Sequence, residues 1–143
     1  MQDILVPICV PGEARWAAEQ AIAMYRKQPV RIHLLNVQRP LPRHVSRFFG
    51  GSDLHDFHRD AGIRVMEIAI RALDEAGVPH QDHVLVGSPA ETIVHFAGEH
   101  HCGEVVLANE PGGVLSIFGL GSIGSQVRHL MQAHAADAPS RGT

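Results

Sequence analysis

The chain has 143 residues, of which 45% are hydrophobic, and this length and composition are typical of one compact domain with a full core. Twelve Lys and Arg against fifteen Asp and Glu give a formal net charge of −3, and the basic residues are scattered, which argues against nucleic acid as a partner. The first ten residues contain an acid where a signal peptide needs basic residues, and their apolar run is too short to span a membrane. We therefore expect a cytoplasmic protein with no membrane partner.

The first half of the chain predicts two strands and two helices. The apolar run at 3–8 predicts a strand buried on both faces, and 30–37 predicts a second. Between them, the period of residues 13–27 is helical, and 56–76 repeats that pattern. The apolar stripes of these two helices consist of Ala14, Ala17, Ala18, Ala21, Met24 and Tyr25, and of Met66, Ala69, Ile70 and Leu73.

An irregular segment of about 20 residues separates the second strand from the second helix, which is long for a compact domain. Phe48 and Phe49 lie in this segment beside Arg43 and Arg47. The two aromatic side chains either form a docking patch for a partner protein or fold back over the core, and the sequence leaves both alternatives open.

The second half of the chain continues the alternation. Residues 83–87 predict a third strand, and Ser88 is expected to cap the next helix, with Pro89 at its first position and Glu91 completing a capping box. A fourth strand is expected at 104–109, and a fourth helix from about residue 122. The buried faces of these two helices are predicted to be Ala90, Ile93, Val94 and Ala97, and Ile123, Val127, Leu130 and Met131.

Strands that alternate with helices at these lengths predict an α/β domain with a doubly wound, Rossmann-like parallel sheet. We expect a single domain over 1–135 and a disordered tail over 136–143. A ligand crevice is expected outside the carboxyl ends of the strands, between the first and fourth strands, where the strand order reverses.

Eleven histidines and two cysteines raise the question of a metal site. His55 and His58 could face the same way but lack a third ligand, whereas the consecutive His100, His101 and Cys102 point about 100° apart. We predict solvated surface histidines and no metal. Cys9 and Cys102 are expected to be thiols, and Cys9 a small buried hydrophobe rather than a reactive group.

Five segments carry a resemblance to a known family: "ILVPI", "HLLNV", "GSPAETIVHFA", "VVLANEPGG" and "GSIGSQVRHL". In this order, over roughly residues 3–131, the chain resembles the universal stress protein family. The resemblance implies a small cytoplasmic domain, typically a homodimer, that acts under stress or growth arrest and in some members binds ATP. It also implies a fifth strand after Leu130, but the tail "MQAHAADAPSRGT" has no apolar run, so we expect four strands and a homodimer that covers the fourth.

The ATP-binding members carry the motif G-x2-G-x9-G-[ST] after the fourth strand. Its marked positions fall here on Ala108, Pro111, Gly121 and Ser122, and the acidic residue that contacts the nucleoside falls on Cys9. A methyl group at Ala108 and the missing N–H of Pro111 weaken a phosphate cradle. Ser122 is either a remnant of an anion site or an ordinary helix cap.

The candidate nucleotide-binding residues are Ile8, Cys9, Val37, Ala108, Asn109, Gly112, Gly113, Gly121, Ser122 and Ile123. The sequence shows no catalytic constellation. The favoured interpretation is a non-enzymatic stress-response domain with weakened or lost nucleotide binding. The alternatives are a competent ATP-binding domain that uses Mg, with or without slow hydrolysis of ATP, and a dimerisation or scaffold module without a ligand.

Overall fold

Four parallel strands form the centre of the fold, in the order β3-β2-β1-β4. The computed structural model describes residues 1–108. The strands are β1 (Gln2–Pro7), β2 (Val30–Gln38), β3 (His80–Val86) and β4 (Cys102–Val105). The loop from residue 109, the helix expected from about 122, the region after Leu130 in which no fifth strand is expected, and the tail fall outside the described residues.

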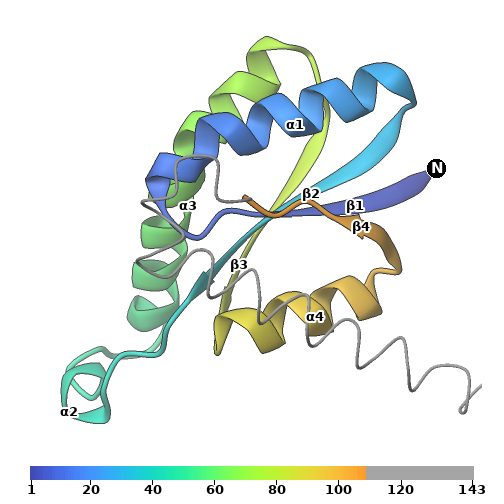
Figure 1. The fold of residues 1–143 in the computed structure, drawn as a ribbon. Coiled ribbons are helices and arrows are strands. Elements are labelled where there is room, and N and C mark those ends of the chain that lie inside the picture. Colours follow the sequence, from blue (N-terminus) through green and yellow to red (C-terminus); the bar gives the residue numbers. More distant parts are fainter. Residues whose placement is uncertain (109–143) are drawn as a thin grey trace, which may run out of the picture.

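Helices cover both faces of this sheet (Figure 1). A short 3-10 turn, η1 (Pro11–Glu13), leads into α1 (Ala14–Lys27), and the long connection after β2 contains α2 (Arg43–Ser46) before α3 (Asp53–Glu75). The last described helix is α4 (Pro89–Glu99). The predicted α/β class and doubly wound parallel sheet are confirmed, because β1 lies between β2 and β4 and helices pack on either side.

Two separate cores hold the layers together. On one face, α1 and α3 pack against the sheet through side chains such as Ile4, Ile32 and Met66, which are fully buried. On the other face, α4 packs against Leu5 and Leu35. Alternate residues of β1 and β2 enter opposite cores, which explains why both strands are apolar without interruption.

The predicted faces of α1, α3 and α4 are confirmed, whereas that of the helix expected from about 122 lies outside the described residues, and several boundaries differ. β3 begins at His80 rather than at residue 83, because this strand pairs only with β2 among the described strands and tolerates polar residues. β4 ends at Val105 and not at 109, and its pairing with β1 is irregular between Asp3 and Ile4. α3 begins three residues earlier than expected, at Asp53.

The start of α4 is partly as predicted. Ser88 is the N-cap residue, with extended backbone angles, and Pro89 occupies the first turn. The expected capping box is wrong, because the Ser88 side chain makes no capping hydrogen bond. Among the described helices, none has an apolar stretch long enough to cross a bilayer.

Candidate functional site

The carboxyl ends of β1 and β2 meet at a pair of buried polar contacts. The Asn36 side chain is 1% exposed, and its Nδ2 donates a hydrogen bond to the carbonyl oxygen of Ile8 at 2.9 Å. Its Oδ1 accepts from Gln38 Nε2 at 2.7 Å, and the Ile8 amide donates to the Leu35 carbonyl at 2.9 Å. These bonds hold the residues after β1 in place against β2.

The turn after β1 is organised by one carboxylate. Glu13 is 5% exposed, and its Oε1 accepts hydrogen bonds from the backbone amides of Cys9 at 2.9 Å and Val10 at 3.1 Å. Burial raises the pKa of Glu13, and the two backbone hydrogen bonds partly oppose that rise. The amides of Cys9 and Val10, which follow β1, therefore already have a hydrogen-bond acceptor within the chain.

Cys9 follows the end of β1 and is not a reactive thiol. Burial raises the pKa of Cys9 to about 12, the nearby Glu13 carboxylate adds to the rise, and Arg39 opposes it. A thiol with this pKa carries almost no thiolate at neutral pH. This supports the predicted interpretation of Cys9 as a small buried group, although its side chain is only partly buried.

Four of the ten candidate residues lie within the described range. Ile8, Cys9 and Val37 come from the adjacent carboxyl ends of β1 and β2, and Ile8 is fully buried. Ala108 follows β4, which pairs with β1, so its chain segment leaves the sheet on the same side. Asn109, Gly112, Gly113, Gly121, Ser122 and Ile123 lie outside the described residues.

Sequence reasoning missed Glu13 and Asn36. Glu13 lies three residues beyond Val10, at a spacing from which its carboxylate reaches back to amide groups. Asn36 is a single amide in an otherwise apolar strand, and such a residue needs an internal partner when it is buried. Both signals were present in the sequence, but neither one identifies the partner.

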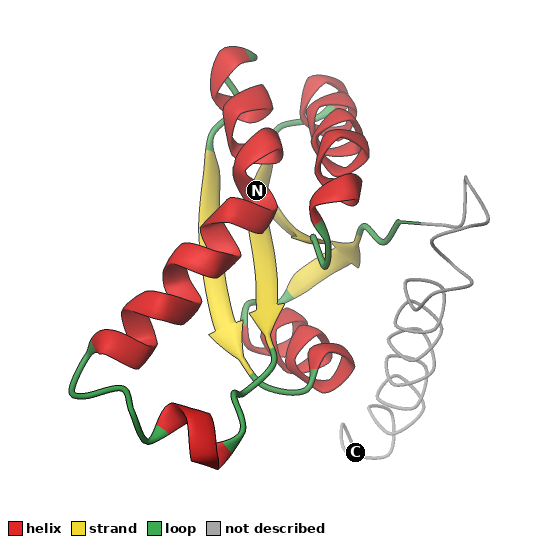
Figure 2. Cartoon of the chain, turned by 90° about the vertical axis from the view of Figure 1, so that its left-hand side faces the viewer, coloured by secondary structure: helices red, strands yellow, loops and turns green. Residues whose placement is uncertain are grey.

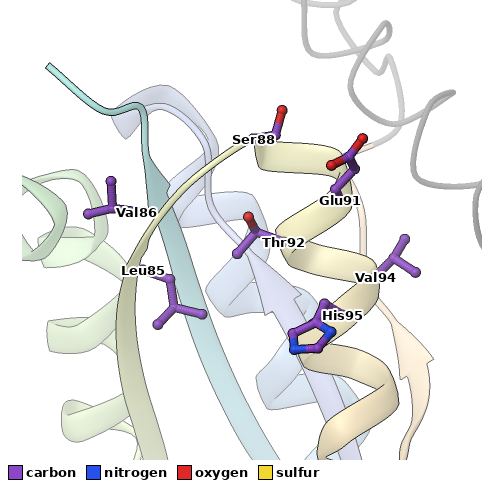
Figure 3. Close-up of a pocket in the computed structure, with 7 residues that line it drawn as sticks. All are labelled: Leu85, Val86, Ser88, Glu91, Thr92, Val94 and His95. Carbon is purple, nitrogen blue, oxygen red and sulfur yellow. The ribbon is translucent and has the colours of Figure 1, made fainter. Parts of the chain in front are cut away.

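A separate open hollow of about 600 Å³ lies between the end of β3 and α4 (Figure 3). Leu85 and Val86 come from β3, and Thr92 and His95 project from α4 toward it. Leu85 and Val86 are 38% and 48% exposed. This hollow is at the β3 end of the sheet, away from the predicted crevice beside β1 and β4.

The prediction of surface histidines is wrong for His33 and His58. His58 is 5% exposed because the buried stripe of α3 extends back to its first turns, and its Nδ1 has no hydrogen-bond partner in the described part of the chain. His33 Nε2 lies 3.1 Å from Asp3 Oδ1, and His33 Nδ1 lies 3.1 Å from His83 Nε2. Within residues 1–108 no three His, Cys, Asp or Glu side chains are grouped to hold a metal ion.

The imidazoles of His33, His83 and His100 form one aromatic cluster with Phe96 beneath α4. Their ring centroids lie 5.3–5.8 Å apart. Burial lowers the pKa of His83, and positive charge on His33 or His100 lowers it further. The hydrogen bond from His33 holds the pKa of Asp3 below its usual range, with Arg31 assisting. Because the rings are in close contact, a positive charge on one imidazole disfavours a second charge on its neighbours.

Comparisons with known proteins agree on one family. A model of the universal stress protein family matches residues 1–133. A protein of that family from Burkholderia pseudomallei is 20% identical, with a TM-score of 0.64 and 90% and 89% of the two chains covered. A universal stress protein in complex with cAMP is 17% identical, with a TM-score of 0.64 and 90% of each chain covered. The universal stress protein from Archaeoglobus fulgidus in complex with dAMP is 22% identical, with a TM-score of 0.57 and 89% of each chain covered. The search of curated proteins finds no match.

Proposed function

Because the chain belongs to the universal stress protein family, we propose that it is a non-enzymatic regulatory domain of the stress response in which nucleotide binding is weakened or lost. Related structures hold cAMP and dAMP, so an adenine nucleotide is the ligand class to consider. The place for it is the crevice beyond the carboxyl ends of β1 and β4, between which the strand order reverses.

The observation that carries this proposal is the Glu13 carboxylate at the end of β1. In the family's binding members this end of the first strand contacts the nucleoside, and free backbone groups there could serve as its hydrogen-bond partners. Here the amides of Cys9 and Val10 donate to Glu13 instead. A ribose or adenine at the end of β1 would therefore have to displace the buried Glu13 carboxyl group or do without these two amides.

Cys9 adds to this effect. According to the resemblance, members that bind a nucleotide carry at this position an acidic residue that contacts the nucleoside. This chain has a thiol there instead, and a thiol accepts hydrogen bonds only weakly. The thiol is protonated, since its pKa is about 12. The Cys9 side chain therefore offers a ribose or adenine neither a carboxylate nor a strong donor.

The two thiols of the chain also support a function without cysteine chemistry. Burial raises the pKa of Cys102 to about 11, and the Asp3 carboxylate contributes to the rise. Neither cysteine is thus a ready nucleophile at neutral pH.

We also propose a cytoplasmic homodimer that meets on the β4 side of the sheet. β4 is the last described strand on that side, and apolar Val105 and Leu107 pack there only partly buried. A second copy related by a two-fold axis is the simplest closed cover for such a strand. Light scattering at tens of micromolar is expected to give a dimer, and a monomer would overturn this part of the proposal.

Calorimetric titration with Mg-ATP tests the role of Glu13. Glu13→Gln keeps an oxygen that can accept from the two amides but removes the charge, so we expect it to bind Mg-ATP several-fold more tightly than the unaltered protein. Glu19→Gln is the matched control, because Glu19 is an exposed acid on the neighbouring α1, and it should leave binding unchanged. Equal affinities for Glu13→Gln and the unaltered protein would show that Glu13 does not limit binding.

A further inference from the structure

The connection between β2 and α3 extends beyond the carboxyl end of the sheet and carries α2 at its tip (Figures 1 and 2). It has a defined shape. The amides of Val45 and Ser46 both donate to the Pro42 carbonyl at 2.9 Å. The rings of Phe49 and Phe57 lie 5.3 Å apart and join the connection to α3. A surface built on this segment is therefore largely organised before any partner binds.

The tip of the connection exposes apolar side chains. Phe48 is 78% exposed, Phe57 is 41% exposed and Val45 is 37% exposed. The sequence left open whether the two neighbouring rings form a docking patch or fold back onto the protein, and they differ in this respect. Phe49 packs against Phe57 and is partly buried, whereas Phe48 faces outward. The guanidinium carbon of Arg47 lies 5.2 Å from the centre of the Phe48 ring. A large aromatic side chain at this exposure is a common mark of an interaction site.

Before the start of α3, which carries Asp53 and Asp56 in its first turn, the connection has one sign of charge. Residues 39–52 contain Arg39, Arg43 and Arg47 together with His44, and no Asp or Glu. In residues 1–108 the ion pairs formed by arginine are those of Arg31 and Arg71, so the three arginines of the connection have no carboxylate partner there. Arginine and aromatic residues are enriched at protein interfaces, and a guanidinium binds a carboxylate through two parallel hydrogen bonds.

We propose that Arg43, Val45, Arg47, Phe48 and Phe57, here called the arginine–aromatic surface, bind an acidic segment of another protein that carries an aromatic anchor. Carboxylates of the partner pair with the arginines, and its anchor packs on Phe48 and Phe57. Arg47 beside the exposed Phe48 ring, and Arg43 one helical turn before Arg47, together determine this choice of partner. The proposal does not depend on nucleotide binding.

The test uses the full chain and three labelled eight-residue peptides in fluorescence anisotropy. The first peptide consists of Asp and Glu with two tryptophans, the second replaces the tryptophans by serine, and the third replaces the acids by their amides. We expect the first peptide to bind and the other two to bind at least about tenfold more weakly. Salt should weaken the binding, because the charges are exposed.

Variants locate the binding on this surface. Phe48→Ser and the pair Arg43→Glu with Arg47→Glu should each reduce affinity about tenfold or more. The pair Arg15→Glu with Arg26→Glu makes the same charge change at exposed positions of α1 and should leave affinity unchanged. Circular dichroism checks that each variant is folded.

Four outcomes would overturn the proposal. The folded Phe48→Ser variant binds as tightly as the unaltered protein, or the serine peptide binds as tightly as the tryptophan peptide. In the third, vesicles of phosphatidylglycerol bind the protein through Phe48 while the acidic peptide does not, which assigns the surface to a membrane. In the fourth, Phe48→Ser converts a dimer into a monomer in light scattering, which assigns the surface to a second copy of the chain.

Discussion

Asn36 Nδ2 donates a hydrogen bond to the carbonyl oxygen of Ile8 at 2.9 Å, and both residues are at most 1% exposed. The bond joins the end of β2 to the residue that begins the turn after β1. Asn36→Leu leaves that buried carbonyl without this donor, so we expect a loss of about 1–3 kcal/mol in the free energy of unfolding. Denaturant melts measure it. Gln81→Leu is the control, because it replaces an amide by leucine at an exposed position of β3. A loss from Gln81→Leu as large as that from Asn36→Leu would contradict this role.

At Gly62, α3 lies close against Val84 of β3. A Cβ atom at Gly62 would lie 2.6 Å from both methyl carbons of Val84 and 3.1 Å from Asn36 Oδ1, so Gly62→Ala should destabilise the protein by about 1–3 kcal/mol. Gly98, near the end of α4, is the matched control, since a Cβ there would meet no atom of the described residues within 4 Å. Gly98→Ala is expected to stabilise by about 0.5–1 kcal/mol. Thermal melts that give both variants the same sign would refute the packing of α3 on β3.

Ile93 tests the register of α4. Its side chain is fully buried beneath the helix, so Ile93→Ala should cost about 2–5 kcal/mol. His95 lies on the exposed side, where it pairs with Glu99, and His95→Ala should cost little. Urea melts of the two variants are the measurement. Losses of equal size would show that the buried face of α4 is wrongly identified.

His83 should make the fold sensitive to acid. Burial lowers the pKa of His83 below 6.5, so between that lowered pKa and 6.5 the unfolded chain binds more protons than the folded one. Stability is therefore expected to fall as the pH drops through this window. His83→Gln should flatten the decline, whereas His95→Gln on the exposed side of α4 should not. Melts between pH 5 and 7.5 decide the matter: equal slopes for His83→Gln and the unaltered protein would exclude His83 as the cause.

Much of the fold is predictable because burial on both faces leaves a clear pattern. Strands β1 and β2 contact both cores, so their apolar runs are almost unbroken. The start of β3 was missed because His80 and Gln81 lie in a strand with fewer neighbours. The burial of His58 was predictable in principle, since His58, Gly62 and Met66 are spaced by four along α3.

The candidate site was less predictable, because it depends on contacts between segments. The family resemblance implies that Cys9 stands where binding members carry an acid, but it does not indicate that Glu13 accepts hydrogen bonds from the amides of Cys9 and Val10. The His33–His83 contact follows from how β2 and β3 align, with His33 opposite Gln81, and this register is not encoded in either strand alone.

Calorimetric titration of Mg-ATP into the unaltered protein and into the triple variant Cys9→Asp, Ala108→Gly, Pro111→Gly tests the central claim most directly. The account predicts a Kd weaker than about 0.1 mM for the unaltered protein, and binding at least about tenfold tighter for the triple variant. Because the Asp introduced at residue 9 would lie near the Glu13 carboxylate, the triple variant is also titrated with Glu13→Gln added, which should tighten binding further. Micromolar binding of Mg-ATP by the unaltered protein would contradict the claim that its nucleotide site is weakened.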